Sequence, residues 1–333
     1  MVALDANGAD RGPRNVAEGG LRAGVPVTIF GPAAELEGFD GVVDAPVAIT
    51  NDEDPARAVR AKPDASMVQA ARAVKDGRAG AFVTPGSTGA ALAAGLFHLK
   101  RMRGVHRPAV AVRVPVPGRA VLLLDCGANV DSRPEWLVQF AYMGAAYMEG
   151  VHGVKRARVG LLSVGEEPKK GTDAVVEANR VLRDGPLNFA GNVEGGDLMR
   201  GQLDVVVTDG FTGNVALKLM EGTAKVVTGA IRDAARSNPL AAAGGLLMRP
   251  ALGGMRREFD PDSTGGAVLL GLRNPAVVGH GSSGPDGIAN AVRLAASCVR
   301  EQAVERTAEL LRKGGATRGG LAARSGPAEP VGA

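Results

Sequence analysis

The chain has 333 residues, 45% of them hydrophobic but only 3% aromatic, and it carries a formal net charge of +4. Its length suits one large α/β domain or two smaller ones, and the scarcity of aromatic rings argues against a nucleic-acid partner, because such rings stack on single-stranded bases. The mild basic excess suits an acidic partner, an anionic membrane surface or an acidic substrate, although a solvated basic surface explains it equally well.

Targeting and redox features are few. The first five residues, MVALD, predict a strand and not a leader peptide, and no run reaches the roughly 18 apolar residues that span a bilayer. Cys126 and Cys298 match neither a disulfide framework nor a metal site. We therefore expect a reducing, cytoplasmic setting.

Apolar runs and helical patterns alternate along the chain and predict a strand–loop–helix rhythm. Strands are predicted at residues 2–4, 27–30, 46–49, 81–84, 109–114, 120–124, 159–163, 188–190, 205–208 and 276–278. Helices are predicted at 15–22, 66–76, 134–151, 173–182, 213–236 and 287–313, with an alanine-rich helix from the PGSTGA segment to Leu99.

Residues 1–313 are expected to form a single α/β domain. Within them, residues 237–260 combine apolar clusters, glycine pairs and arginines, which predicts short helices that project from the body on a dimer or membrane side. The tail 314–333 is rich in Gly, Ala and Pro and is predicted to be disordered.

Five of the predicted strands end in polar, glycine-containing loops. Continuous β-branched runs are typical of strands buried on both faces of a parallel sheet, whose strand-to-helix loops emerge at one edge. We therefore expect these five loops to converge on one site. Backbone N–H groups at helix starts attract anions, phosphate above all. The loops are PGSTGA, DCGANVDSRPE, VGEEPKKGTD, DGFTGN and GHGSSGPDG.

Three of these loops carry candidate chemistry. Lys170, in VGEEPKKGTD, could neutralise phosphate or a developing oxyanion, or belong to a solvated charged turn. Asn214, in DGFTGN, could donate to a carbonyl oxygen, or this loop could be an ordinary helix cap. Ser87 and Thr88, in PGSTGA, fit a phosphate nest or a plain cap, but the spacing is not that of a Walker loop.

His280 and Cys126 are the remaining candidates for acid–base or nucleophilic chemistry. His280 could move a proton, although a lone histidine is more often structural. Cys126 ends a strand without a nearby histidine in sequence, so a small buried thiol is favoured over a nucleophile. Neither a metal-ligand spacing nor a dinucleotide fingerprint is present.

Taken in order, the segments resemble the bacterial phosphate acyltransferase family called PlsX, over about residues 1 to 305. The block at residues 188–222 is long and the most specific. The motifs that carry the resemblance are ALDANGAD, KPDASMVQAARAVKDG, TPGSTGA, DCGANVDSRPEWLVQFAYMG, VGLLSVGEEPKKGTD, NFAGNVEGGDLMRGQLDVVVTDGFTGNVALKLMEG and GHGSSGPDGIANAVRLA.

The resemblance implies a three-layer αβα fold with a mostly parallel sheet, of the isocitrate/isopropylmalate dehydrogenase type and related to phosphotransacetylase. It implies transfer of a long-chain acyl group from acyl carrier protein to inorganic phosphate, without organic cofactor or metal, by a homodimer. The acyl phosphate would feed a membrane-bound glycerol-3-phosphate acyltransferase in phospholipid synthesis. A cytoplasmic enzyme peripherally attached to an anionic membrane surface is therefore expected.

The resemblance also implies roles for particular residues. Lys170 and Asn214 would stabilise the oxyanion, while Asp209 and His280 would orient groups or move protons. Two loops depart from the family pattern: Ala9 stands where the M-G-G-D loop has Gly, and Ser87 where the G-N-T-G loop has Asn. Substrate-binding residues would be Asp5, Gly8, Asp10, Ser87, Thr88, Asn129, Glu166, Asn192, Glu194, Thr212, Gly213 and Ser282.

Three alternatives remain open from the sequence. A phosphotransacetylase that uses short acyl-CoA would share the fold and the phosphate chemistry. A catalytically weak subunit that recruits lipid-synthesis proteins would not need Lys170 and Asn214. A nicotinamide-dependent decarboxylating dehydrogenase of the same fold would need metal-binding aspartates and an arginine cluster, which the sequence does not offer.

Overall fold

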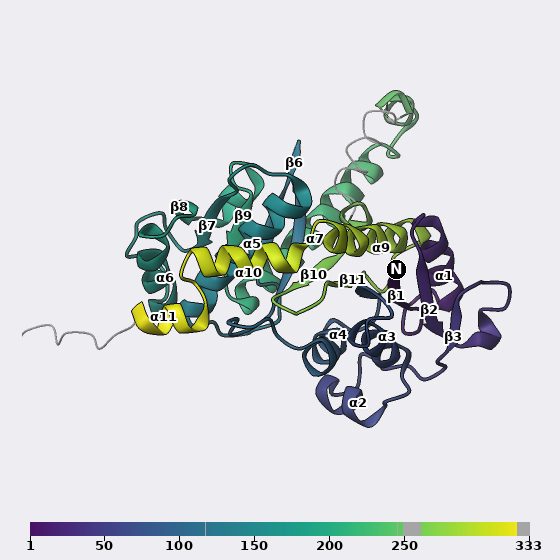
Figure 1. Cartoon of the computed structure of the whole chain (residues 1–333). Helices are drawn as coiled ribbons and strands as arrows, with labels where there is room; N and C mark the ends of the chain where they lie inside the picture. Colours follow the sequence, from purple (N-terminus) through teal and green to yellow (C-terminus); the bar gives the residue numbers. More distant parts are fainter. Residues whose placement is uncertain (117, 245, 249–260, 325–333) are drawn as a thin grey trace, which may run out of the picture.

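The computed structural model describes residues 1–116, 118–244, 246–248 and 261–324, and its centre is an 11-stranded mixed sheet (Figure 1). The strand order is β3-β2-β1-β4-β11-β10-β5-β6-β9-β7-β8. The strands are β1 Val2–Asp5, β2 Val27–Gly31, β3 Val42–Asp44, β4 Ala81–Thr84, β5 Ala109–Val116, β6 Arg119–Leu124, β7 Arg158–Leu162, β8 Asn188–Val193, β9 Val205–Val207, β10 Ala267–Leu270 and β11 Ala276–Val278.

Helices cover both faces of this sheet. One core packs α1, α5, α6, α9 and α10 on one face, and a second packs α2, α3 and α4 on the other. Because most strands are buried on both faces, both cores consist mainly of Ala, Val and Leu. The helices are α1 Pro13–Arg22, α2 Pro55–Ala61, α3 Ser66–Lys75, α4 Thr88–Ala94, α5 Pro134–His152, α6 Asp173–Arg183, α7 Gly210–Ala234, α9 Pro285–Arg300, α10 Ala303–Lys313 and α11 Arg318–Arg324.

The sheet reverses direction in its middle. Strands β3, β2, β1, β4 and β11 run parallel to one another, and so do β6, β9, β7 and β8. Between the two groups, β10 pairs antiparallel with β11 and with β5, and β5 pairs antiparallel with β6. Three antiparallel steps make the second group run opposite to the first. We call them the first and second halves of the sheet.

Several predicted boundaries are wrong, for identifiable reasons. The third strand lies at Val42–Asp44 and not at residues 46–49, where Pro46 has no N–H for a ladder. Helix α2 was missed; Asp54 caps it by accepting a hydrogen bond from the Arg57 N–H at 2.7 Å. The last predicted helix is two, separated at Gln302, which has φ 53°.

The C-terminal segment also differs from its prediction. Residues 318–324 form α11 instead of a disordered tail, and Leu321 is buried in the core. An apolar anchor of this kind supplies the burial that the surrounding Gly and Ala residues cannot. The rest of the predicted tail, from residue 325, lies outside the described residues.

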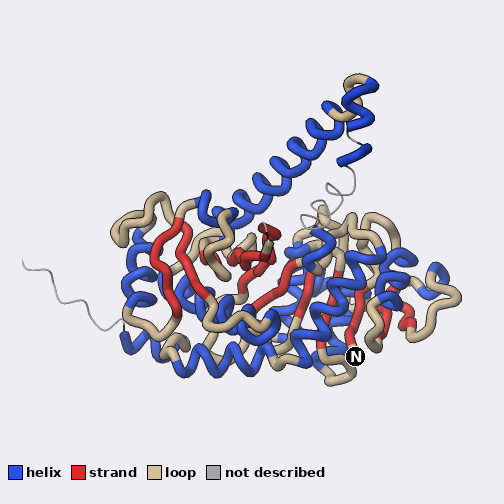
Figure 2. The backbone as a smooth tube through the Cα atoms, turned by 90° about the horizontal axis from the view of Figure 1, so that it is seen from above, coloured by secondary structure: helices blue, strands red, loops and turns tan. Residues whose placement is uncertain are grey.

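Among the described residues, helix α7 is the long element that leaves the body. It projects away from the sheet on the side opposite residue 1 (Figure 2), and of its 25 residues only Gly210 and Gly213 are buried. Residues 239–244 and 246–248, which lie in the predicted segment 237–260, continue the projection as short helical pieces. The remainder of that predicted segment, residues 249–260, lies outside the described residues.

Candidate active site

The ends of three neighbouring strands bring the N-terminal candidate residues together. Loops leave β1, β4 and β11 at the same edge of the sheet, where the Asp10 N–H donates to the Gly281 carbonyl at 3.0 Å. A Cβ at Gly8 would meet the Gly86 Cα at 3.9 Å. We call this set the first loop group. It contains Gly8, Asp10, Ser87, Thr88, His280 and Ser282.

Asp5 lies beneath the first loop group and does not reach a substrate. Its side chain is 0% exposed, so its predicted role in substrate binding is wrong. It accepts hydrogen bonds from Ser66 Oγ at 2.6 Å and Thr84 Oγ1 at 2.7 Å, and Thr84 Oγ1 in turn accepts from the Gly86 N–H at 3.0 Å. Burial raises the pKa of Asp5 to about 6, against these hydrogen bonds, which lower it. Asp5 therefore supports the PGSTGA loop from below.

The remaining side chains of the first loop group face solvent or are half-buried. Ser87 occupies the N-cap position of α4 but makes no side-chain capping bond, which leaves its hydroxyl to point elsewhere. His280 Nδ1 lies 2.9 Å from Ser282 Oγ, and both residues are exposed. The group thus offers hydroxyls, one imidazole and loop amides, which suit an oxyanion such as phosphate.

The loop after β7 presents Lys170. Its backbone carbonyl accepts from Ser163 Oγ at 2.9 Å and from Asn192 Nδ2 at 3.1 Å, while the residue itself is exposed. Asn192 is only 5% exposed and also donates to the Glu167 carbonyl at 2.9 Å. Asn192 therefore stabilises the loop that carries Lys170, and its predicted contact with substrate is wrong.

Two acidic candidates near this loop have different surroundings. Glu166 is exposed beside Lys170, as a substrate contact would require. Glu194 is exposed as well, but its side chain forms a capping box with Asp197 over the short helix Gly195–Met199. Its carboxylate is thus already engaged by the Asp197 N–H.

The start of α7 presents Asn214. Asp209 caps this helix, accepting from the Thr212 N–H and from Thr212 Oγ1, each at 2.8 Å. Asn214 is exposed directly after the first turn, and the adjacent Gly213 is buried against the Asp125 carbonyl. The N-cap reading of this loop is therefore correct for Asp209, and it leaves Asn214 available for chemistry.

The loop after β6 contains a residue that sequence reasoning missed. Asp125 is 0% exposed and accepts from the Asn129 N–H at 2.7 Å and from Asn129 Nδ2 at 2.9 Å. Asn129 Nδ2 also donates to the Pro108 carbonyl at 2.8 Å, so its amide group is turned inward. The available signal was the pair Leu124-Asp125, which repeats Leu4-Asp5 at the end of a strand.

A second loop group follows the adjacent strands β6, β9 and β7. It contains Lys170, Asn214, Asp209, Thr212, Gly213, Asn129 and Glu166. The premise that all five loops leave one edge of a parallel sheet is wrong, because the halves run in opposite directions. The twist of the sheet counteracts this reversal. About 20–25° per neighbouring pair accumulates to roughly 150° over the seven steps from β1 to β7. A twist of this size turns the carboxyl ends of the second half back toward the side on which the first loop group lies. Consistently, α7 begins on the side of the molecule opposite the start of β1 (Figure 2).

Cys126 is unsuited to nucleophilic chemistry. It is 6% exposed, and burial raises the pKa of its thiol far above the ordinary range. Its N–H is bonded to the Val110 carbonyl at 2.9 Å. The buried structural reading of this cysteine is therefore confirmed.

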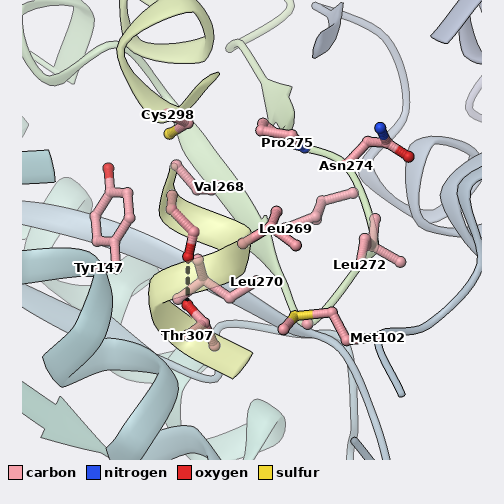
Figure 3. Close-up of a pocket in the computed structure, with 13 residues that line it drawn as sticks. Met102, Tyr147, Val268, Leu269, Leu270, Leu272, Asn274, Pro275, Cys298 and Thr307 are labelled. Atoms are coloured by element: carbon pink, nitrogen blue, oxygen red, sulfur yellow. Dashed lines mark hydrogen bonds between the residues drawn. The ribbon is translucent and has the colours of Figure 1, made fainter. Parts of the chain in front are cut away.

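The apolar hollow in Figure 3 lies away from both loop groups. It lies near the end of β10 and the beginning of β11. Its lining includes Met102, Leu270, Leu272, Pro275, Tyr147, Cys298 and Thr307. Its volume is about 20 Å³, room for about one water molecule. Among the described residues, no group of three or more His, Cys, Asp or Glu could hold a metal ion.

The arrangement of strands and helices is an α/β fold that is also found in phosphotransacetylases and in a dehydrogenase. A phosphotransacetylase from Streptococcus pyogenes matches with a TM-score of 0.58 over 92% of this chain and 94% of its own, at 18% identity. A 4-hydroxythreonine-4-phosphate dehydrogenase from Klebsiella pneumoniae matches with a TM-score of 0.51 over 90% and 98%, at 14% identity. The predicted fold class is confirmed.

Sequence comparison identifies the family. Residues 1–306 match the model described as "Fatty acid synthesis protein". The phosphate acyltransferase of Geobacillus sp. (strain WCH70) is 42% identical over 324 residues, which cover 94% of this chain and 98% of that protein. That of Elusimicrobium minutum (strain Pei191) is 44% identical over 310 residues, 88% and 91% of the two chains. The chain belongs to the phosphate acyltransferase family.

Proposed function

We propose that this protein transfers a long-chain acyl group from acyl carrier protein to inorganic phosphate and so makes acyl phosphate for phospholipid synthesis. The observation that carries the proposal is the position of Lys170 and Asn214. These two exposed, polar residues follow β7 and β9, which are paired neighbours in the sheet. A cation and an amide donor at adjacent strand ends suit the developing negative charge of an acyl-transfer reaction.

The reaction needs no acyl-enzyme intermediate. A phosphate oxygen attacks the thioester carbonyl carbon, and Lys170 with Asn214 stabilises the resulting oxyanion. Collapse of the tetrahedral intermediate forms the C–O bond of acyl phosphate, breaks the C–S bond and expels the thiolate of the carrier. Because a thiolate is a good leaving group, strong general-acid help is not required. The burial of Cys126 agrees with this direct route.

The first loop group would supply the phosphate contacts. Ser87, Thr88 and the amides around Gly8 and Gly86 offer donors, while Ser282 and His280 lie across the same edge. Asp10 and Glu166 would orient the substrates from the rims of the two groups. The absence of a cofactor and of a metal from this mechanism remains a prediction.

The acyl donor is the point to test. The purified protein is incubated with phosphate and either palmitoyl-carrier protein or acetyl-CoA, and acyl phosphate is trapped as hydroxamate. The proposal expects product from the long-chain carrier substrate and little from acetyl-CoA. The alternative, a phosphotransacetylase acting on short acyl-CoA, is favoured by the structural likeness to such enzymes and expects the reverse preference.

Docking of the acidic carrier protein would use basic residues. Lys100, Arg101 and Arg103 are exposed, but they lie beyond the C-terminal end of α4, while Ser87 and Thr88 lie at its start. They therefore do not flank the PGSTGA loop. If charge guides docking, kcat/KM with the acyl-carrier substrate falls as ionic strength rises. If kcat/KM does not change with ionic strength, docking depends on uncharged contacts.

The projection made by α7 and by residues 239–244 and 246–248, which we call the arm, would serve dimerisation and membrane contact. Leu240, Leu246 and Leu247 are 67% exposed or more near its end, as an apolar surface without a partner would be. No helix among the described residues is long and apolar enough to cross a bilayer. We propose a cytoplasmic homodimer that touches an anionic membrane and hands its labile product to a membrane-bound glycerol-3-phosphate acyltransferase.

Vesicle sedimentation separates the two uses of the arm. Wild type and a Leu246→Glu/Leu247→Glu variant are mixed with anionic liposomes, and their masses are measured in solution. A variant that stays dimeric but no longer sediments supports a membrane contact. A variant that becomes monomeric assigns these leucines to the subunit interface. A wild type that never sediments at low salt contradicts the membrane contact.

A further inference from the structure

We infer that Asp125 is a positioning residue, which fixes the start of α7 and with it the side chain of Asn214. This inference rests on the proposed role of Asn214 in acyl transfer. Asp125 directly follows the last residue of β6 and is completely buried. Neither of its carboxylate oxygens can contact a substrate, so any influence on the reaction must pass through the groups that it holds.

The carboxylate is saturated with N–H donors. Its Oδ1 accepts from the Val110 N–H at 2.9 Å and from the Ala128 N–H at 3.0 Å. Its Oδ2 accepts from the Asn129 N–H at 2.7 Å and Asn129 Nδ2 at 2.9 Å. A single side chain thus ties strand β5 to the loop after β6. Backbone N–H groups only donate, so only an acceptor with two oxygens satisfies all of them.

The loop that Asp125 folds is the seat of α7. The Asn129 carbonyl accepts from the Gly210 N–H at 2.7 Å, at the first residue of the helix. A Cβ at Gly210 would lie 2.5 Å from the same carbonyl and 2.8 Å from Asp125 Oδ2, so only glycine allows this approach. A side chain at Gly213 would collide with the Asp125 carbonyl oxygen. The first turn of α7 therefore rests directly on the loop.

Asn214 directly follows that first turn and lies above the same loop. A Cβ at Gly127, which has φ 115°, would be 3.8 Å from the Asn214 Cγ. Because α7 is exposed along nearly all of its length, few other contacts determine where its first turn sits. Loss of the Asp125 tether should consequently shift Asn214, even though the two side chains do not meet.

The test uses Asp125→Asn, with Asp204→Asn as the matched control. Asparagine has nearly the same shape but one acceptor oxygen, and its amide group would face N–H donors. Asp204 is likewise buried and accepts from Arg119 and from the Arg158 N–H at 2.8 Å, but it precedes β9 at the end of the strand away from α7. Both variants lose a buried carboxylate, and only one loses the seat of α7.

Two measurements are made on each folded variant. In Asp125→Asn we expect kcat to fall about 10- to 100-fold at nearly constant KM for phosphate, because small misplacements of a catalytic group cost this much. Hydrogen exchange should accelerate across residues 208–216. In Asp204→Asn, neither quantity should change at comparable thermal stability. If Asp125→Asn does not fold, Asn129→Ala removes one of the four bonds and should show the same pattern more weakly.

The outcomes are distinct. Unchanged exchange across residues 208–216 in the folded Asp125→Asn variant overturns the inference, and so does faster exchange with unchanged kcat. An equal fall of kcat in Asp204→Asn also overturns it, because the effect would then be general destabilisation. If wild type forms no acyl phosphate from either donor, the proposed function fails. The exchange data then decide separately whether Asp125 holds the start of α7.

Discussion

The two halves of the sheet each place a buried aspartate at the end of a strand, but they surround it differently. Asp5 in the first half accepts mainly from the hydroxyls of Ser66 and Thr84, whereas Asp125 in the second half accepts from N–H groups alone. A hydroxyl can donate or accept, so it can adapt to a protonated carboxyl group; an N–H cannot. The surroundings of Asp5 can therefore accommodate the protonated form of its carboxyl group, whereas those of Asp125 cannot.

The largest expected effect in this comparison belongs to the second half, where the oxyanion would be stabilised. Lys170→Ala and Asn214→Ala should each lower kcat about 100- to 1000-fold, equivalent to about 2.7–4 kcal/mol, as removal of an oxyanion donor does. Initial rates with palmitoyl-carrier protein and phosphate measure this. Lys169→Ala, one residue away in the same exposed turn, is the control and should remain active. Near wild-type turnover by folded Lys170→Ala would remove this lysine from the mechanism.

The next effect is a pH dependence of stability in the first half. Burial raises the pKa of Asp5 from 3.8 to about 6, so the folded protein binds this proton more tightly than the unfolded chain. Its contribution to the free energy of unfolding is therefore largest below about pH 4 and declines as the pH rises toward 6. At about 1.4 kcal/mol per pH unit, the decline is about 3 kcal/mol.

Asp5→Asn isolates this contribution. Urea unfolding of wild type and variant is compared at pH 4 and pH 7, and wild type should lose up to about 3 kcal/mol more than the variant over this range. An asparagine can accept from one hydroxyl and donate to the other, so we expect the variant to fold. Identical pH dependence in the two proteins would mean that Asp5 does not titrate in this window.

A smaller effect concerns the cap of α7. Asp209→Ala should lower the free energy of unfolding by about 1 kcal/mol, as loss of an N-cap does, and should lower activity because Asn214 directly follows the first turn. Thr172→Ala removes the cap of α6, where Thr172 accepts from the Val175 N–H at 3.3 Å, and is the matched control. Equal activity losses in both variants would reduce Asp209 to a general stabiliser.

The smallest effect is expected at Cys126. Its thiol is buried, and burial raises its pKa, so it is not poised as a thiolate. Cys126→Ser should keep most of the activity of wild type in the same assay. A folded but inactive serine variant would instead require a thiol in the mechanism.

Predictions from the sequence succeeded where periodicity and local motifs suffice. The buried strands, the helices after them and the exposed positions of Lys170 and Asn214 all follow from apolar runs that stop at polar loops. Predictions failed where burial decided the role of a polar residue. Asp5 and Asn192 look like substrate ligands in sequence, but their side chains are buried and hydrogen-bond to the loops that they support. The sequence alone does not distinguish a residue that contacts substrate from one that supports a loop, because both are polar residues at a strand end.

The family, the alternation of strands and helices, and the residue types available for acyl transfer can be read from the amino-acid sequence, because these depend on local pattern. The reversal of the sheet through β10, β5 and β6 cannot, since strand pairing joins residues far apart in the chain. The donors that surround each buried aspartate likewise follow from the packing of the folded chain. Asp5 and Asp125 share the same local Leu-Asp pattern, yet packing brings hydroxyls to one and backbone amides to the other.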